Sequence, residues 1–272
     1  MFEQRDALLR LLGDDDPATR ELVKAQIAKS GHEALGELRA LLPAATPLAA
    51  RHLRDVIAEI EERDADAIFS QFCATFPEHG PLEEAVWGLA TTFSPGETFF
   101  SQRQMIDRWG AEVARRLSKV STALDRVETL AEYLSDEVHL RGNETDYYNI
   151  DNSLLPEVVD TGLGIPISLS VVYMMVGRRA GIPVDGVGLP GHFLVRHEDI
   201  FFDPFHGGRR VGLEECRELV RQQNLELRPE YLAPATPRQI LVRMLANLFA
   251  IAENTDPLLA EKLAGWMGSL RG

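Results

Sequence analysis

The sequence predicts an α+β fold, in which helices come first and a small antiparallel sheet follows. Apolar residues recur at helical spacing over roughly the first 140 positions. A fully apolar helix is then expected at 166–180. Three short runs with strand character follow it, "PVDGVGL", "HFLVRH" and "IFFDPF". Helices followed by a small antiparallel sheet are typical of α+β proteins.

Residues 1–65 are expected to form a separate helical module. Asp16 is a good N-cap for a helix that starts with Pro17. Apolar residues then continue at helical spacing as far as Ile60, in pieces of about 10 to 15 residues joined by "KSGHE" and "LPAATP". This pattern resembles a pair of HEAT-type helical hairpins. Such a module packs against or binds protein rather than carrying out chemistry.

Residues 66–225 are expected to form the main domain, with helices near 67–73, 82–93, 99–117 and 123–138 before the apolar one. Pro166 suits the first turn of that central helix, and Gly181 suits its end. A helix that is apolar on nearly every face is buried at the centre of a domain. Its start, "GLGIP", offers no side-chain cap, so backbone N–H groups there must find water or a ligand. A helix start of this kind stabilises a thiolate or an oxyanion.

Residues 226–272 are expected to form a C-terminal helical hairpin, with Thr236 and Pro237 at the start of its first helix. The turn "NTDP" separates the two helices. A single hairpin cannot form a solenoid, so we expect it to dock on the main domain or to make a dimer contact.

The strands predict a pairing between His192 and Asp203. If Glu198 and Asp199 form the tip of a hairpin, Leu194 lies opposite Asp203, and His192 and Asp203 become diagonal neighbours on one face of the sheet. A carboxylate in this position fixes the tautomer of the imidazole and raises its basicity. The alternative is a histidine that only satisfies a buried aspartate.

Further polar candidates lie in "GNETDYYNIDNS" and "DPFHGG". Asn152 is a good N-cap for the following turn, and Tyr147 and Tyr148 can line a groove or stack on a ligand. The alternative is a hydrogen-bonded connecting loop. His206 lies in a glycine-rich turn, so its direction does not follow from the sequence. We expect no metal and no cofactor, although His192, Asp203 and His206 have the side chains to hold a divalent ion together.

The block from residue 141 to residue 208 resembles the SirB-one family, a bacterial branch of the transglutaminase-like superfamily, which is related to papain-type folds. The motifs "DYY", "NS", "GIPISLS", "GVGLPGHFLVR" and "DPF" occur in that order, and the similarity extends over about 67–225. Active members of the superfamily use a cysteine at the start of the central helix, with a histidine and an aspartate on adjacent strands. The resemblance therefore assigns the latter two roles to His192 and Asp203. It places Pro166 at the position of the cysteine. It also implies that the C-terminal hairpin is a shortened remnant of tetratricopeptide-like helices.

The proline at position 166 removes the expected nucleophile. Attack on an amide carbonyl needs a thiolate, a base and oxyanion donors within reach of one point. Ser168 points away from the direction of position 166, and Ser170 lies one turn deeper. Cys73 and Cys216 stand among apolar residues and are expected in the core.

Composition limits the partners. Lysine and arginine number 28 against 42 for aspartate and glutamate, so the net charge is -14. This charge argues against nucleic acid and membrane surfaces as partners. Two cysteines, no signal peptide and no membrane-spanning stretch indicate a soluble cytoplasmic protein. The favoured function is a non-catalytic module that binds a protein or peptide. The alternative is a slow hydrolase or acyl-transferase acting on amide or ester bonds with His192 and Asp203. The oligomeric state does not follow from the sequence.

Overall fold

The computed structural model describes residues 5–271, which divide into two compact units. The smaller unit comprises the described residues up to Gln71 together with Thr91–Glu97. The larger unit comprises Phe72–Ala90 and the chain from Thr98 onward. Each unit has its own apolar core.

The smaller unit is helical. Its elements are α1 (Arg5–Leu12), α2 (Pro17–Ala28), the 3-10 turns His32–Ala34 and Leu42–Ala44, α3 (Leu35–Leu41) and the first part of α4 (Pro47–Thr75). As expected, Asp16 caps α2, because its carboxylate accepts from the N–H groups of Ala18 and Thr19. Leu12, Ile27, Leu38, Leu53 and Ile60 are among its buried core residues.

Helix α4 corrects the prediction of short helices on either side of residue 65. It runs unbroken for 29 residues, through the segment where a new helix was expected at 67–73. The physical reason is visible in the sequence, since neither glycine nor proline occurs between Pro47 and Thr75.

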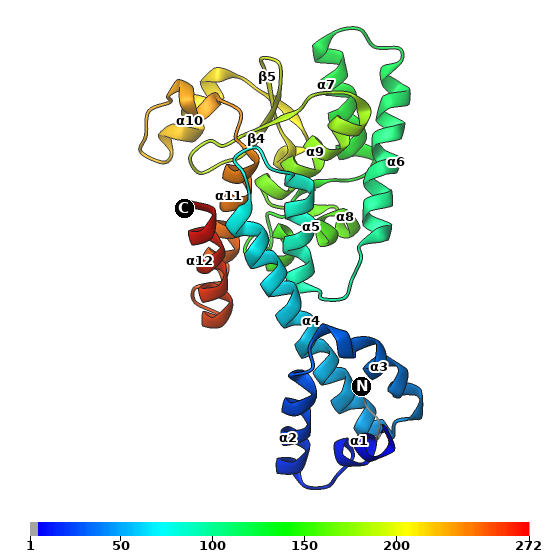
Figure 1. Cartoon of the computed structure of the whole chain (residues 1–272). Helices are drawn as coiled ribbons and strands as arrows, with labels where there is room; N and C mark the ends of the chain where they lie inside the picture. The colour runs from blue at the N-terminus through cyan, green and yellow to red at the C-terminus, as the bar shows by residue number, and fades with distance from the viewer. Residues whose placement is uncertain (1–4, 272) are drawn as a thin grey trace. The chain divides into compact units, whose positions relative to one another are not determined.

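The larger unit is built around α9 (Pro166–Ala180), which has the bounds expected from the sequence. The other helices before the sheet are α5 (Leu82–Phe93), α6 (Phe100–Leu117), α7 (Ala123–Glu132), which continues as a π-helical turn (Tyr133–Glu137), and α8 (Leu155–Thr161). Helices α6 and α9 lie side by side (Figure 1). Nearly all of α9 is buried, as its apolar faces require.

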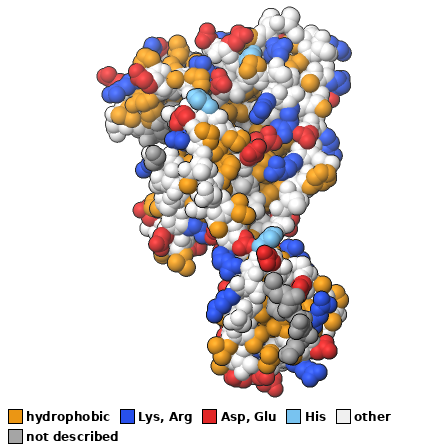
Figure 2. Space-filling model, in the orientation of Figure 1, with side chains coloured by type: hydrophobic (Ala, Val, Ile, Leu, Met, Phe, Trp, Pro, Cys, Tyr) orange, Lys and Arg blue, Asp and Glu red, His pale blue; other side chains and the backbone are white. Residues whose placement is uncertain are grey.

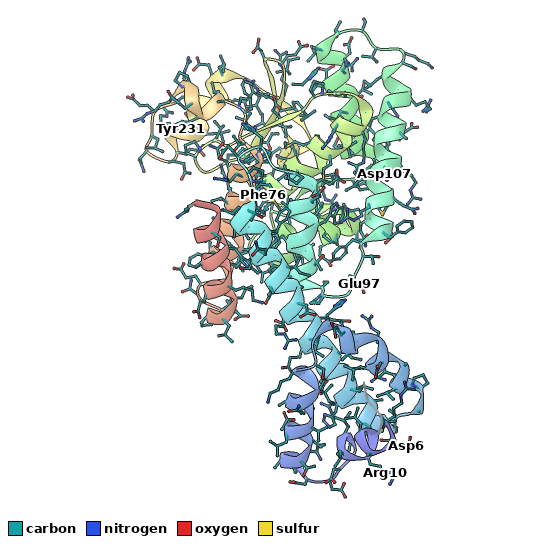
Figure 3. The ribbon with its side chains drawn as sticks, viewed as in Figure 1. Asp6, Arg10, Phe76, Glu97, Asp107 and Tyr231 are labelled. Atoms are coloured by element: carbon teal, nitrogen blue, oxygen red, sulfur yellow. The ribbon has the colours of Figure 1, made fainter. Side chains whose placement is uncertain are left out.

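A shared arginine ties three of these helices together. Arg179 of α9 donates through Nη2 to Glu83 of α5 at 2.7 Å and through Nε to Asp107 of α6 at 2.5 Å. Asp107 is labelled on α6 in Figure 3. These ion pairs and the α6–α9 packing hold the central helix in one orientation.

The main sheet is antiparallel, with β3 (Asp185–Val187), β4 (Leu194–His197), β5 (Ile200–Asp203) and β6 (Arg209–Val211) in that order. Val195 pairs with Phe202 and Arg196 with Phe201, so Glu198 and Asp199 form the tip of the hairpin as predicted. Strand β6 was not expected. A further short parallel pair, β1 (Arg141–Gly142) with β2 (Leu163–Gly164), was also missed.

The sheet lies between two helices of the larger unit. On one face, Leu194, Phe201 and Val211 pack against Cys216 and Val220 of α10 (Leu213–Arg221). The ring of Phe202 is 6.2 Å from that of Tyr173 in α9, on the opposite face. The second helix layer, α10, follows β6 directly.

The two edges of the sheet differ. Beside β3, Val187 forms an isolated bridge with Pro234, and the N–H of Ala235 donates to the carbonyl of Gly186 at 2.8 Å. The opposite edge strand, β6, is three residues long and carries the exposed side chains of Arg209 and Arg210.

The chain ends in the predicted hairpin. After a 3-10 turn (Pro229–Leu232), α11 (Pro237–Ala252) and α12 (Pro257–Arg271) run antiparallel (Figure 1). Thr236 caps α11, since its hydroxyl accepts from the N–H of Gln239. Helix α11 also packs against α9, so the hairpin is part of the larger unit.

Acidic and basic groups are interspersed over the face shown in Figure 2. Among residues 5–271, no helix combines the length and apolar character that crossing a membrane requires.

Candidate functional site

The start of α9 has no side-chain cap, as expected from the sequence. Ile165 is the N-cap, and its N–H donates to the hydroxyl of Ser168 at 3.1 Å. Ser168 donates in turn to the carbonyl of Asn152 at 2.6 Å, and Ser170 donates to the carbonyl of Pro166 at 2.7 Å. Both serines are fully buried. Their hydroxyls are therefore committed to the backbone, and neither is placed as a nucleophile.

His192 and Asp203 meet as the strand register predicts. Nε2 of His192 lies 2.9 Å from Oδ2 of Asp203. The carboxylate is 1% exposed, and its other oxygen accepts from the N–H of Phe205 at 3.0 Å. The sequence predicted His192 within a strand, but it lies two residues before β4. The N–H of His192 closes a turn onto the carbonyl of Leu189, which ends the strand ladder early.

His206 joins the same carboxylate. It ends the 3-10 turn Pro204–His206, and its Nδ1 lies 2.7 Å from Oδ2 of Asp203. An ionised carboxylate only accepts hydrogen bonds, so both rings donate to it. In the neutral rings this leaves Nδ1 of His192 and Nε2 of His206 with free lone pairs. Burial raises the pKa of Asp203, but hydrogen bonds and charge from His192 and His206 outweigh burial and hold that pKa below its usual value.

Tyr147, Tyr148 and Phe205 form an aromatic rim beside His206. The ring of Tyr147 is 5.3 Å from that of Tyr148 and 6.0 Å from that of Phe205. Phe205 in turn contacts the ring of His206 edge-on, with centroids 5.1 Å apart. Tyr148 is 74% exposed, and the side chain of His206 is 44% exposed. Burial raises the pKa of Tyr147, as does the neighbouring Tyr148. The rim is thus open to solvent, whereas the aspartate behind it is closed off.

Asn152 has a different position from the one predicted. It lies in a 3-10 turn (Ile150–Ser153), and the N-cap of α8 is Leu154. Its buried amide donates to the carbonyls of Asp146 at 2.6 Å and Tyr147 at 3.2 Å, and accepts from Asn143 at 2.9 Å. Asn152 therefore holds the loop that presents Tyr147.

Gly142 connects the start of α9 with the histidine turn. It pairs with Gly164, two residues before Pro166, in the parallel β1–β2 contact. A Cβ atom at Gly142 would lie 2.5 Å from the ring of Phe205, so only glycine lets this ring pack against the strand. Sequence reasoning missed this residue, because a strand of two residues has no period to detect.

Arg243 was also missed. From α11, its guanidinium donates to the carbonyls of Leu189 at 2.9 Å and His192 at 2.6 Å. It also stacks over the ring of Phe193, at 5.3 Å from the centroid. Burial lowers the pKa of Arg243. This arginine fixes the loop that carries His192. It lies 51 residues away along the chain, so no local pattern could have indicated it.

The two cysteines are core residues, as expected. Cys73 and Cys216 are both buried, and Cys216 packs among Val187 and Leu194. Burial raises the pKa of the Cys73 thiol to about 12 and also raises that of Cys216. Neither thiol is activated.

Residues 101–246, more than half of the chain, match the profile of the Transglutaminase-like superfamily. The chain belongs to this superfamily. His192, Asp203, His206, Tyr147 and Arg243 all lie within the part that matches the transglutaminase-like profile.

Relatives of this transglutaminase-like chain occur in bacteria and mammals. A UPF0162 protein of Xylella fastidiosa is 45% identical over 134 residues, which cover 46% of this chain and 48% of that protein. A UPF0162 protein of Pseudomonas aeruginosa is 33% identical over 192 residues, covering 66% and 68%. F-box only protein 21 of Homo sapiens is 30% identical over 132 residues, covering 44% of this chain and 20% of the relative. The chain spans about half the length of the Xylella relatives it matches. No solved structure shows a significant match.

Proposed function

We propose that this transglutaminase-like chain is a non-catalytic member of the SirB-one branch that binds a protein or peptide segment. Its binding surface comprises His192, His206 and the aromatic rim, and we call it the histidine–aromatic surface. One observation carries the proposal: Pro166 stands where the resemblance places the cysteine, while the hydroxyls of Ser168 and Ser170 are committed to backbone carbonyls.

The histidine–aromatic surface has the composition of a protein-binding site. Tyrosine offers a large, rigid contact area with a polar tip, and residues of this kind dominate the energetics of interfaces. The free lone pairs of His192 and His206 can accept hydrogen bonds from backbone N–H groups of a bound segment. The net charge of -14 favours a basic segment, because opposite charges steer association.

A second candidate is a slow hydrolase or acyl-transferase. It is supported by the orientation of His192, whose Nε2 is bound to a buried carboxylate while Nδ1 is not used in that contact. This is the arrangement of a general base. A base alone contributes about 10² to 10⁴-fold to a rate, so such an enzyme would be slow.

The experiment compares four proteins on an array of peptides with varied charge and on chromogenic amide and ester substrates. These proteins are the wild type, the double variant Tyr147→Ala/Tyr148→Ala, His192→Ala and Phe100→Ala. Phe100 is an exposed aromatic residue on α6 and serves as the matched control. We expect the double tyrosine variant to bind basic peptides at least about tenfold more weakly, while Phe100→Ala binds as the wild type does.

The same assays separate the two functions. Equal, background rates of substrate turnover for the wild type and His192→Ala are expected. Turnover that depends on His192 would instead establish the enzymatic function. Unchanged peptide binding by the tyrosine double variant would refute the proposed binding surface.

A further inference from the structure

We propose that His192, Asp203 and His206 bind a single divalent metal ion, of which zinc fits the ligands best. One ligand atom from each of the three lies within 4.8 Å of the other two. Two imidazole nitrogens and one carboxylate oxygen form a ligand set that zinc takes in proteins, with a fourth position left for water or another group. This inference goes beyond peptide binding and does not depend on it.

The carboxylate lies at the centre of the three ligands. Oδ2 of Asp203 is 2.9 Å from His192 and 2.7 Å from His206. Ligand atoms about 2.0 to 2.1 Å from a tetrahedral zinc ion stand about 3.3 Å apart. The two histidine–aspartate contacts therefore need to open by about half an ångström to admit the ion, and the two imidazole nitrogens, within 4.8 Å of each other, need to come to about the same 3.3 Å separation. Both rings already point a nitrogen at the oxygen that would share the ion.

Groups around the three ligands hold them in place. The N–H of Phe205 binds the second oxygen of Asp203, and Arg243 holds the carbonyl of His192. Asp203 and His206 are only one 3-10 turn apart, so their separation is fixed by the backbone. Outer contacts of this kind orient metal ligands and raise affinity. The partly exposed ring of His206 gives an ion a route to the buried carboxylate.

Metal binding would rearrange protons without any other reactant. In the neutral rings, Nε2 of His192 and Nδ1 of His206 carry the protons that they donate to Asp203. When these nitrogens bind the ion, each proton moves to the opposite ring nitrogen through solvent. The ion replaces both hydrogen bonds and places a divalent positive charge beside the buried carboxylate of Asp203.

The test uses the full chain after removal of metal with a chelator. Isothermal titration with zinc chloride should give one site per chain, and cobalt chloride should produce the visible absorption bands of a tetrahedral site. His206→Gln and His192→Gln should each weaken zinc binding by at least about 100-fold and abolish the cobalt bands. His32→Ala removes an exposed histidine of the smaller unit and should change neither.

Zinc affinity that is unchanged in both glutamine variants, or a wild-type Kd weaker than about 1 mM, would overturn the proposal. His206 is partly exposed, so circular dichroism should show that His206→Gln stays folded. The peptide array run with chelator present tests the histidine–aromatic surface alone. Loss of metal binding and loss of peptide binding are therefore separate results.

Discussion

His192 and Asp203 are joined by a 2.9 Å hydrogen bond between Nε2 and Oδ2, although eleven residues separate them along the chain. The hairpin tip at Glu198 and Asp199 brings them together. The carboxylate is almost fully buried and also binds the exposed His206. A change at Asp203 should therefore affect both the stability of the domain and the properties of its surface histidines.

Asp203→Asn should lower the free energy of unfolding by about 2 kcal/mol at pH 7, because the imidazoles of His192 and His206 lose their charged acceptor. The pKa of Asp203 is depressed in the folded state, so the unfolded state binds more protons near pH 4. The stabilisation is therefore present above the usual carboxyl pKa of about 3.9 and is lost as the pH falls through the folded pKa. Urea unfolding of the wild type and of Asp203→Asn at pH 7 and pH 3 measures this difference in the free energy of unfolding. A difference between wild type and variant that is as large at pH 3 as at pH 7 would contradict it.

Ser168→Ala should destabilise the chain by about 1 to 2 kcal/mol, because the variant loses the acceptor for the buried N–H of Ile165 and the bond to the carbonyl of Asn152. Ser170→Ala is the matched control. Its hydroxyl binds only the carbonyl of Pro166, four residues earlier, which the helix can still satisfy. Thermal unfolding should show the larger loss for Ser168→Ala. Equal losses would mean that the contacts of Ser168 with Ile165 and Asn152 add no stability.

Pro166→Cys should create a reactive thiol if the transglutaminase-like arrangement persists around α9. A helix start and a nearby imidazole lower a thiol pKa, and each unit of lowering gives about tenfold more thiolate near pH 7. Alkylation by iodoacetamide should therefore be about tenfold faster in Pro166→Cys than in Pro166→Cys/His192→Ala. Identical alkylation rates in the two proteins would show that His192 does not interact with the thiol at position 166. Wild-type Cys73 and Cys216, both buried, give the background rate.

Gly142→Ala should destabilise the larger unit by about 1 to 3 kcal/mol, because the added methyl group overlaps the ring of Phe205. Gly268→Ala in α12 is the opposite control. A Cβ atom there meets no neighbour within 4 Å, so alanine should raise stability by about 0.5 to 1 kcal/mol through helix propensity. Differential scanning calorimetry of the two variants measures the expected loss of stability in Gly142→Ala and the expected gain in Gly268→Ala. A stable Gly142→Ala protein would mean that Phe205 has room to move.

Strong local patterns predicted the central features of the fold. The apolar run starting at Pro166 and ending before Gly181 specified α9, and the alternation around Glu198 and Asp199 specified the register that joins His192 to Asp203. Burial of Cys216 also followed from helical spacing. Each of these depends on residues close together in the chain.

Other features depend on contacts between distant segments and could not be predicted. The hydroxyl of Ser168 binds the carbonyl of Asn152, which comes from another turn, and the side-chain amide of Asn152 anchors the preceding loop. Arg243 reaches His192 from a helix near the end of the chain. The direction of His206 depends on the left-handed glycine that follows it, Gly207. A periodic pattern contains none of this information.

Both edge strands of the main sheet are shielded, and this limits how a partner can bind. Residues near Pro234 already cover the backbone of β3, and Arg209 and Arg210 place two cations on the short strand at the other border. These features disfavour extension of the sheet by a strand of a bound peptide. Recognition then depends on the side chains of the histidine–aromatic surface, so a bound segment should tolerate methylation of its amide nitrogens except at those that donate to His192 and His206.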